Sequence, residues 1–127
     1  ADLDPDFQER CLPILKAAAE KGEVRPGDVA YLEDRVRVAQ KRPQLYGTQY
    51  GVRHDADGNS MKDASGAMIY LLPVVEDAAG LDERRAAVGL GPWFEYETMM
   101  ANMQNREPSK TPTDWDDTLP IDPQRKR

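Results

Sequence analysis

Residues 34–51 read Asp-Arg-Val-Arg-Val-Ala-Gln-Lys-Arg-Pro-Gln-Leu-Tyr-Gly-Thr-Gln-Tyr-Gly, and within them a helical pattern gives way to a strand pattern. Pro43 ends the helical part, because proline disfavours helical backbone in the residue before it. Side chains that form hydrogen bonds gather at this junction, and loops held between rigid elements often display binding groups. The junction is therefore where we expect a binding site.

Two amphipathic helices are predicted ahead of the junction. The first covers residues 4–21 and contains Pro13, which predicts either a kink or two shorter helices. Its apolar stripe consists of Phe7, Cys11, Leu15 and Ala18. The second helix begins at Pro26, and the short connection predicts that the two helices pack as an antiparallel pair.

A β-hairpin is predicted after the junction, with residues 44–53 and 67–72 as its arms. Strand alternation would place Gln44, Tyr46 and Thr48 on one face of the first arm. The polar connection contains a strong turn signal at residues 55–59, and no repeat is recognised at any period.

Two short helices are predicted to close the domain. Asp82 is expected to cap the first, which ends at Gly89, and the second runs from Pro92 to Met103. The fold class is thus α+β and mostly helical, with one globular domain over residues 1–104. The prolines and charges of residues 105–127 predict an extended or disordered tail.

Composition argues against several classes of function. The net charge of −6, from 17 basic and 23 acidic residues, argues against a protein that grips nucleic acid. No run approaches the ~18 apolar residues of a membrane span, so no membrane partner is expected. A cytoplasmic location is expected, and secretion is left open because the chain starts at Ala1. No cofactor is expected.

Single reactive groups have simple interpretations. Cys11 lies on an apolar stripe and is expected to pack in the core, and His54 is expected to be exposed in a polar turn. One cysteine and one histidine leave little room for zinc. Oxygen ligands are offered by Asp55, Asp57, Asn59 and Asp63. Their spacing departs from the EF-hand pattern, so no metal site is predicted.

Several short patterns gain meaning when they are considered together. They are Asp4-Pro5-x-Phe7-Gln8, Asp34-Arg35-Val36, Gln44-x-Tyr46-Gly47-Thr48-Gln49, Pro73-x-x-x-Asp77 and Asp82-x-Arg84-Arg85-x-x-x-Gly89-Leu90. As a set they resemble a small bacterial family, a domain of unknown function (six-six-two-four), over about residues 2–97. The resemblance implies a helix ahead of this region that ends in a histidine just before Ala1. It implies no activity.

The predicted site combines eight polar side chains at the helix–hairpin junction. They are Asp34, Arg35, Gln44, Tyr46, Thr48, Gln49, Arg84 and Arg85. In the functional interpretation, Arg35 clamps an anionic group and its neighbours recognise a small polar ligand or a protein segment. In the structural interpretation, Asp34 pairs with Arg84 or Arg85, and Arg35 with Asp77 or Asp82. The amides, phenol and hydroxyl would then satisfy nearby helix ends and loop backbone.

Two functions from different classes follow from the predicted site. The first is a binding or interaction module without turnover, which is favoured because no nucleophile–base pair can be assembled. The second is a small cofactor-independent enzyme, a hydrolase or transferase, with Arg35 as the anion clamp and Asp34 or the upstream histidine as the base. In the tail, apolar residues among acids predict a protein-binding motif or an inert extension. These residues are Trp115, Leu119 and Ile121.

Overall fold

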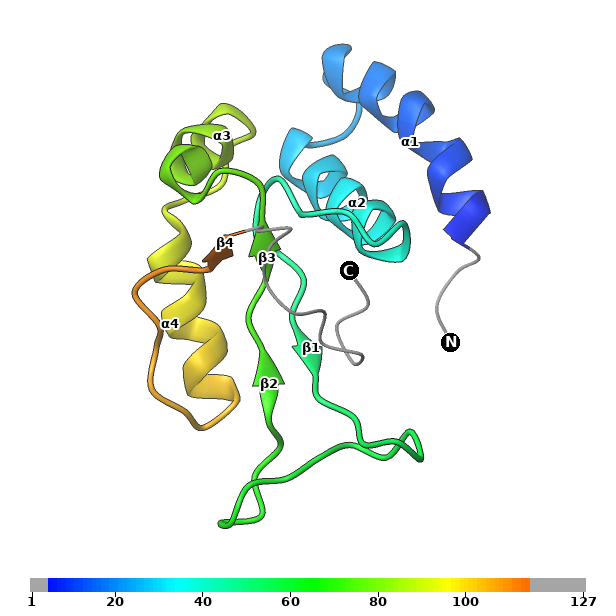
Figure 1. The fold of residues 1–127 in the computed structure, drawn as a ribbon. Helices are drawn as coiled ribbons and strands as arrows, with labels where there is room; N and C mark the ends of the chain where they lie inside the picture. The colour runs from blue at the N-terminus through cyan, green and yellow to red at the C-terminus, as the bar shows by residue number, and fades with distance from the viewer. Residues whose placement is uncertain (1–4, 115–127) are drawn as a thin grey trace.

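The computed structural model describes residues 5–114 of the 127-residue chain. The elements follow in the order α1 (Pro5–Glu20), α2 (Pro26–Ala39), β1 (Gly51–Val52), β2 (Tyr70–Leu71), β3 (Val74–Val75), a 3-10 turn (Ala78–Gly80), α3 (Leu81–Ala87), α4 (Trp93–Met103) and β4 (Thr113–Asp114). The helix pair α1–α2 lies on one side, α3 and α4 lie on the other, and the strands run between them (Figure 1). The predicted fold class, α+β and mostly helical, is confirmed.

The N-terminal helix pair is formed as predicted. α1 runs through Pro13 as a single helix, which removes the alternative of two shorter helices. It packs against α2, and Lys16 forms an ion pair with Glu33 at 3.2 Å. The apolar stripe of α1 is only partly covered, because Cys11 is half-buried and Phe7 is 46 % exposed.

The hairpin is present, but both of its arms are shorter than predicted. β1 and β2 pair antiparallel, with Gly51 opposite Leu71. Residues 44–50 form no strand, since only Gln44 is paired, in parallel, with Val75 of β3. The prediction of one shared face for alternate residues of this segment is wrong, because the backbone turns at Gly47, which has a φ of +64°.

The hairpin connection contains a tandem repeat that sequence analysis missed. Residues 54–61 (HDADGNSM) and 62–69 (KDASGAMI) build the same turn twice. In each, the Oδ1 atom of Asp55 or Asp63 accepts hydrogen bonds from the N–H groups two and four residues later. The glycine at the turn, Gly58 or Gly66, has a positive φ. This arm projects beyond the helices (Figure 1).

The C-terminal half departs from prediction at one helix end. α3 begins at Leu81 with Asp82 already inside it, so the prediction that Asp82 caps α3 is wrong. Its Oδ1 atom instead accepts the N–H of Trp93 at 2.8 Å. Asp82 therefore satisfies the first amide of α4, a donor that has no partner within that helix.

Residues 105–114 stay on the domain rather than leaving it at residue 105. Arg106 and Ser109 bind Glu97, and β4 pairs in parallel with β3. The N–H of Thr113 donates to the Pro73 carbonyl at 3.1 Å. The predicted domain boundary at residue 104 thus falls inside a packed segment. The candidate tail residues Trp115, Leu119 and Ile121 lie outside the described part of the chain.

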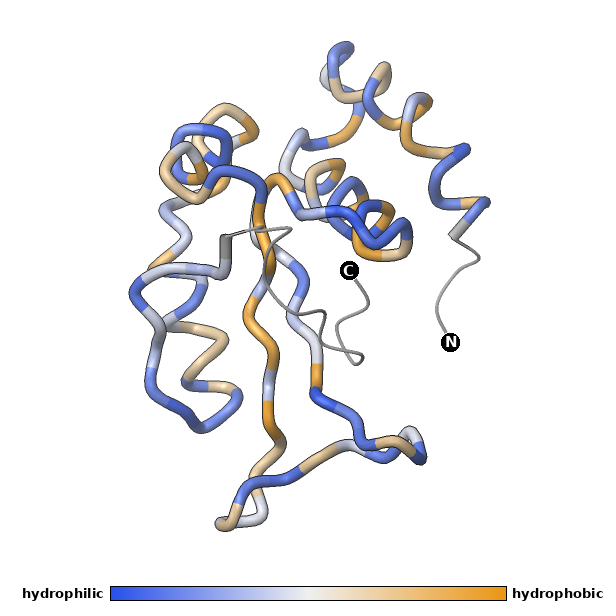
Figure 2. Tube along the Cα trace, in the orientation of Figure 1, coloured by the Kyte–Doolittle hydropathy of each residue, from blue (hydrophilic) through white to orange (hydrophobic). Residues whose placement is uncertain are grey.

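The core lies where β3, α3 and α4 meet. Val75, Leu81 and Trp93 are buried together, and Tyr50 and Tyr96 pack against them. Apolar residues are concentrated along the β2–β3 segment, which crosses the middle of the molecule (Figure 2). Among residues 5–114, no helix is long and apolar enough to span a membrane.

The tandem repeat leads to a prediction about register. Arg53, Met61 and Ile69 follow one another at the repeat period, and the N–H of each donates to the carbonyl of another member of the set. Deleting residues 54–61 should let Arg53 pair directly with Ile69 as in an ordinary hairpin. Halving a flexible loop lowers the free-energy cost of closing it by about 0.6 kcal/mol. Urea unfolding should therefore show a free energy of unfolding that is higher by about that amount.

The control deletes only residues 54–57, which breaks one turn and shifts the pairing of the arm. That variant should unfold at a lower urea concentration than the eight-residue deletion. Equal stability of the two would show that the repeat does not set the register of the arm.

Candidate functional site

A buried carboxylate on α2 sets the path of the chain through the predicted site. Asp34 is 0 % exposed. Its Oδ1 atom accepts the N–H groups of Leu45 (2.9 Å) and Tyr46 (3.2 Å). Its Oδ2 atom accepts the N–H (3.0 Å) and the hydroxyl (2.7 Å) of Thr48. A single side chain thus satisfies three of the six backbone amides of residues 44–49.

The surroundings of Asp34 act on its ionisation in opposite directions. Burial raises the pKa of the Asp34 carboxyl above its ordinary value, and the hydrogen bonds from Thr48, Leu45 and Tyr46 offset only part of the rise. Hydrogen bonds to a carboxylate favour its charged form, whereas loss of water disfavours it. The four donors therefore favour the charged form of Asp34, which burial disfavours.

The carbonyl side of the same loop is satisfied as completely as the amide side. Five consecutive carbonyl oxygens each accept a hydrogen bond from a different side chain. Leu45 accepts from Arg84 Nε (2.8 Å), Tyr46 from Arg85 Nη1 (2.6 Å), Gly47 from Trp93 Nε1 (3.0 Å), Thr48 from the Tyr96 hydroxyl (3.0 Å) and Gln49 from Gln44 Nε2 (2.9 Å). Residues 44–49, which we call the clamped loop, are thereby fastened to α3 and α4.

Gln44 closes the clamped loop on itself. Its Oε1 atom accepts the Gln49 N–H at 3.0 Å, so one amide side chain serves both backbone groups of Gln49. The Gln44 backbone is bonded to β3 through Val74 and Glu76. The side-chain amide of Gln49 donates to the Thr48 hydroxyl at 3.0 Å. These residues act on neighbouring backbone, as the structural interpretation expected of them.

The two arginines of α3 bind carbonyl groups rather than Asp34. Arg85 is buried and also donates to the Gly91 carbonyl at 2.7 Å. Arg84 donates to the carbonyls of Asp77 and Glu76 and lies 4.0 Å from the Asp77 carboxylate. The ion pair of Asp34 with either arginine, which the structural interpretation allowed, is not formed.

Arg35 differs from the other seven predicted residues. It is exposed on α2, and within residues 5–114 it forms no hydrogen bond or ion pair. It therefore does not pair with Asp77 or with Asp82, whose carboxylate holds Trp93. The structure thus gathers seven predicted residues around the clamped loop and leaves the charge of Arg35 free toward solvent.

Tyr46 is the one member of the clamped loop with a phenol. Its side chain is half-buried. Burial and the nearby carboxylates of Glu33 and Asp34 raise the pKa of the Tyr46 phenol, and Arg84 and Arg37 offset part of that rise. The phenol therefore stays protonated near neutral pH and is suited to donate a hydrogen bond rather than to act as a base.

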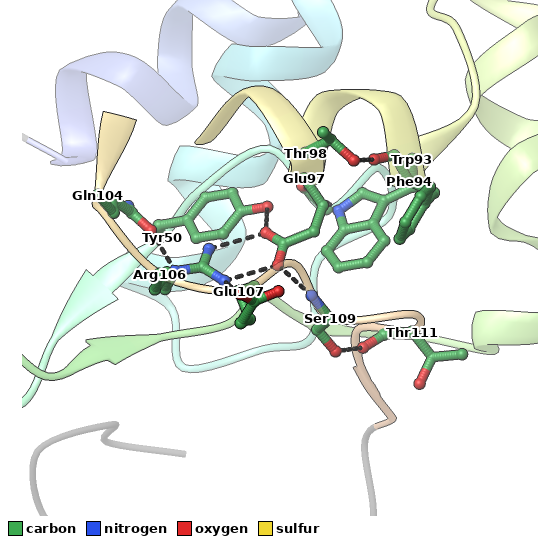
Figure 3. Close-up of polar contacts among 11 residues, drawn as sticks. Tyr50, Trp93, Phe94, Glu97, Thr98, Gln104, Arg106, Glu107, Ser109 and Thr111 are labelled. Atoms are coloured by element: carbon green, nitrogen blue, oxygen red, sulfur yellow. Dashed lines mark hydrogen bonds and ion pairs between the residues drawn. The ribbon is translucent and has the colours of Figure 1, made fainter. Parts of the chain in front are cut away.

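A second buried carboxylate was missed by the sequence analysis. Glu97 of α4 is 0 % exposed and holds Arg106 in a two-pronged ion pair, with Nη1–Oε2 at 2.6 Å and Nη2–Oε1 at 2.8 Å (Figure 3). The Tyr50 hydroxyl and the Ser109 N–H each donate to it at 2.7 Å. Glu97 lies one helical turn after Trp93 and one helical turn before Ala101, and both of these apolar residues are buried. An acid at this spacing on an apolar helix face was the signal available in the sequence.

The ionisation of Glu97 is controlled mainly by its partners. Burial raises the pKa of the Glu97 carboxyl, but the hydrogen bonds from Arg106, Ser109 and Tyr50 outweigh it and hold the pKa below its ordinary value. Burial and the bond to Glu97 raise the pKa of Tyr50 in turn. Glu97 therefore stays charged and Tyr50 stays protonated at neutral pH.

The chemistry open to these groups is that of binding and of structural support. The lone pairs of Asp34 and Glu97 are directed at internal donors. Among residues 5–114, no group of three or more histidine, cysteine, aspartate or glutamate side chains could hold a metal ion. His54 is half-buried and pairs through its backbone with Ser60 in the hairpin connection.

Comparison with known proteins identifies a family. A model described as "Family of unknown function (DUF6624)" matches residues 2–105. This confirms the resemblance expected from the short patterns, and the match ends directly before Arg106. No curated protein and no solved structure matches the chain.

The role of Asp34 can be tested against that of its neighbour. Asp34→Ala leaves three buried or part-buried N–H groups without an acceptor, and each unsatisfied donor costs about 1–3 kcal/mol. We expect urea unfolding, followed by tryptophan fluorescence, to show a loss of at least about 3 kcal/mol. Arg35→Ala is the control and should leave stability unchanged. Equal losses in both variants would mean that the carboxylate does not organise the loop.

The close approach of the clamped loop to α4 can be tested at Gly47. A Cβ atom there would lie 2.9 Å from Trp93 Nε1, and the φ of +64° is unfavourable for other residues. Gly22 has a similar φ of +76° but nothing within 4 Å, so Gly22→Ala isolates the backbone effect. Gly47→Ala should be less stable than Gly22→Ala by about 1–3 kcal/mol of overpacking in thermal unfolding. Matching melting temperatures would contradict the contact with Trp93.

Proposed function

The chain belongs to the Family of unknown function (DUF6624), and because that membership brings no activity with it, we propose a function from geometry alone: a non-catalytic module that binds an acidic protein segment at the C-terminal end of α2. The observation that carries the proposal is the free guanidinium of Arg35. It is exposed, and within residues 5–114 it has no hydrogen-bonding or ionic partner. A planar, permanently charged fork of this kind suits carboxylate recognition.

The charges around Arg35 support an anionic partner. Lys41 and Arg42 are also exposed and follow in the turn after α2. The adjacent acid, Asp34, is buried, and its carboxylate accepts hydrogen bonds from the clamped loop, so it is not exposed beside Arg35. Between residues 34 and 43 the exposed charges are therefore all positive, in a chain whose net charge is −6. Such a patch attracts negatively charged partners over several ångströms at low salt.

Binding without turnover accounts for the same residues better than catalysis does. The enzyme alternative needs Asp34 or an upstream histidine as a base, with Arg35 as the anion clamp. Both oxygens of Asp34 accept internal hydrogen bonds, and the side chain is fully buried. A general base must come within hydrogen-bond reach of the proton that it removes. A substrate would have to displace the clamped loop to reach this one.

A protein segment is proposed in preference to a small ligand because three cations are exposed, Arg35 on α2 and Lys41 and Arg42 in the turn that follows it. An extended acidic peptide can contact such a row of charges, whereas small ligands are usually bound in concave sites. The tail residues Trp115, Leu119 and Ile121 remain a second proposed contact for the same protein partner.

The test measures binding of a fluorescently labelled hexaglutamate peptide by anisotropy at low salt. Arg35→Ala should weaken binding about tenfold, which corresponds to 1.4 kcal/mol for one charge-assisted pair. Arg25→Ala is the matched control, because Arg25 is exposed and bonds only to Asp28 in its own turn. It removes the same charge and should change the affinity less than about twofold.

Two outcomes would overturn the proposal. If Arg35→Ala and Arg25→Ala weaken peptide binding equally, the binding depends on the net charge of the protein and not on a site at Arg35. If the unaltered chain does not bind the peptide, there is no such site. Inorganic phosphate is added as a competitor. If phosphate displaces the peptide at comparable concentration and Arg35→Ala abolishes the effect, the ligand is a small anion instead of a protein segment.

A further inference from the structure

The segment after α4 is held on the domain by contacts of the kind that bind a peptide. We call residues 104–114 the strap. We infer that Tyr50, Glu97 and the outer edge of β3 form a receptor for an extended peptide that carries an arginine, and that the strap occupies this receptor within the same chain. The inference does not depend on the Arg35 surface.

The carboxylate of Glu97 is the specific part of the receptor. Three of its four hydrogen bonds come from the strap, two from the Arg106 guanidinium and one from the Ser109 N–H. Only the Tyr50 hydroxyl comes from the body of the domain. With the strap in place Glu97 is fully buried, and a buried carboxylate without a cation is strongly destabilised, so the occupied receptor requires a cationic partner.

The geometry at Glu97 selects arginine among cations. The two guanidinium nitrogens reach the two carboxylate oxygens separately, which a lysine ammonium cannot do. The guanidinium carbon also lies 5.7 Å from the centre of the Tyr50 ring, within the range of a cation–π contact. Figure 3 shows Tyr50, Glu97 and Arg106 grouped in this way.

The edge of β3 supplies contacts that do not depend on sequence. One side of β3 is bonded to Gln44, and the other side pairs in parallel with β4 of the strap. Pro73 and Val75 are buried where β4 pairs with this edge. Addition of an extended segment to such an edge is a common mode of peptide recognition.

The two contacts together define the peptide. The arginine comes first, the N–H that binds Glu97 follows three residues later at Ser109, and strand pairing begins seven residues later at Thr113. The receptor residues all lie within the family match, which ends at residue 105, whereas the strap residues that bind them lie beyond it. This division is what a receptor with a covalently attached ligand would show.

Attachment explains why another peptide would not bind the intact chain readily. A tethered segment has an effective concentration in the millimolar range, so a free peptide competes only when the strap is weakened. The experiment therefore disables the strap in the full chain with Arg106→Gln and Ser109→Pro. These changes remove three of the strap's hydrogen-bond donors to Glu97 and leave the receptor unaltered.

The probe is a fluorescent peptide of residues 104–114, Gln-Asn-Arg-Glu-Pro-Ser-Lys-Thr-Pro-Thr-Asp. It should bind the disabled chain and raise its melting temperature, and it should bind the unaltered chain at least about tenfold more weakly. Replacing the peptide's arginine (Arg106→Gln) should reduce binding at least about thirtyfold. Lys110→Gln in the peptide is the matched control, because this exposed lysine forms no hydrogen bond or ion pair within residues 5–114, and it should bind as the original does.

A second measurement covers the case in which the disabled chain does not fold. A protease site between Asn105 and Arg106 of the otherwise unaltered chain is cut after folding, and exchange of the cut strap for the labelled peptide is followed. No exchange, or equal loss of binding with the Arg106→Gln and Lys110→Gln peptides, would overturn the inference. Adding Arg35→Ala should change neither result, which separates this site from the Arg35 surface.

Discussion

The structure depends on one buried carboxylate that holds a loop of which only the first residue, Gln44, pairs with a strand. Backbone amides and carbonyls that leave water must find partners, and in most proteins a helix or a sheet provides them. Beyond Gln44 the clamped loop has neither, so Asp34 accepts from its amides while side chains of α3 and α4 donate to its carbonyls. The helices on the two sides of the strands are therefore joined through this loop, and the polar residues at the junction are what makes that connection possible.

The elements could be predicted from sequence more fully than the arrangement at the junction. Helical periodicity, Pro26 and Gly89 indicate where helices begin and end, because these signals act over a few neighbouring residues. The partners of Asp34 could not be deduced in this way. Alternation assigns side chains to faces only while the backbone is regular, and the left-handed turn at Gly47 ends that regularity. The polar residues were located, but the groups that they bind depend on tertiary contacts. Glu97 and Arg106 were missed for the same reason, since their pairing depends on the path of the chain after α4.

The internal use of arginines explains how charge is distributed over the surface. Arg84, Arg85 and Arg106 bind carbonyls or a buried carboxylate, so their charges are withdrawn from solvent. The acids of the same region stay exposed, namely Glu76, Asp77, Asp82, Glu83, Glu95 and Glu107. At the end of α2 the situation is reversed, because Asp34 is inside and Arg35 outside. The net charge of −6 is therefore unevenly distributed over the surface, and the exposed charges between residues 34 and 43 are positive although the whole chain is acidic.

The two buried carboxylates differ in where their partners come from, and this difference has consequences for exchange. Asp34 is satisfied by residues close to it in the chain, and removing its partners would require the clamped loop to unfold together with its contacts to α3 and α4. Glu97 is satisfied mainly by a segment that follows the last helix and is joined to the domain at one end only within the described residues. That segment contributes no residue to the core formed by Val75, Leu81 and Trp93. The same chemistry, a buried carboxylate with several donors, thus serves as a permanent connector in one place and as a site for exchange in the other.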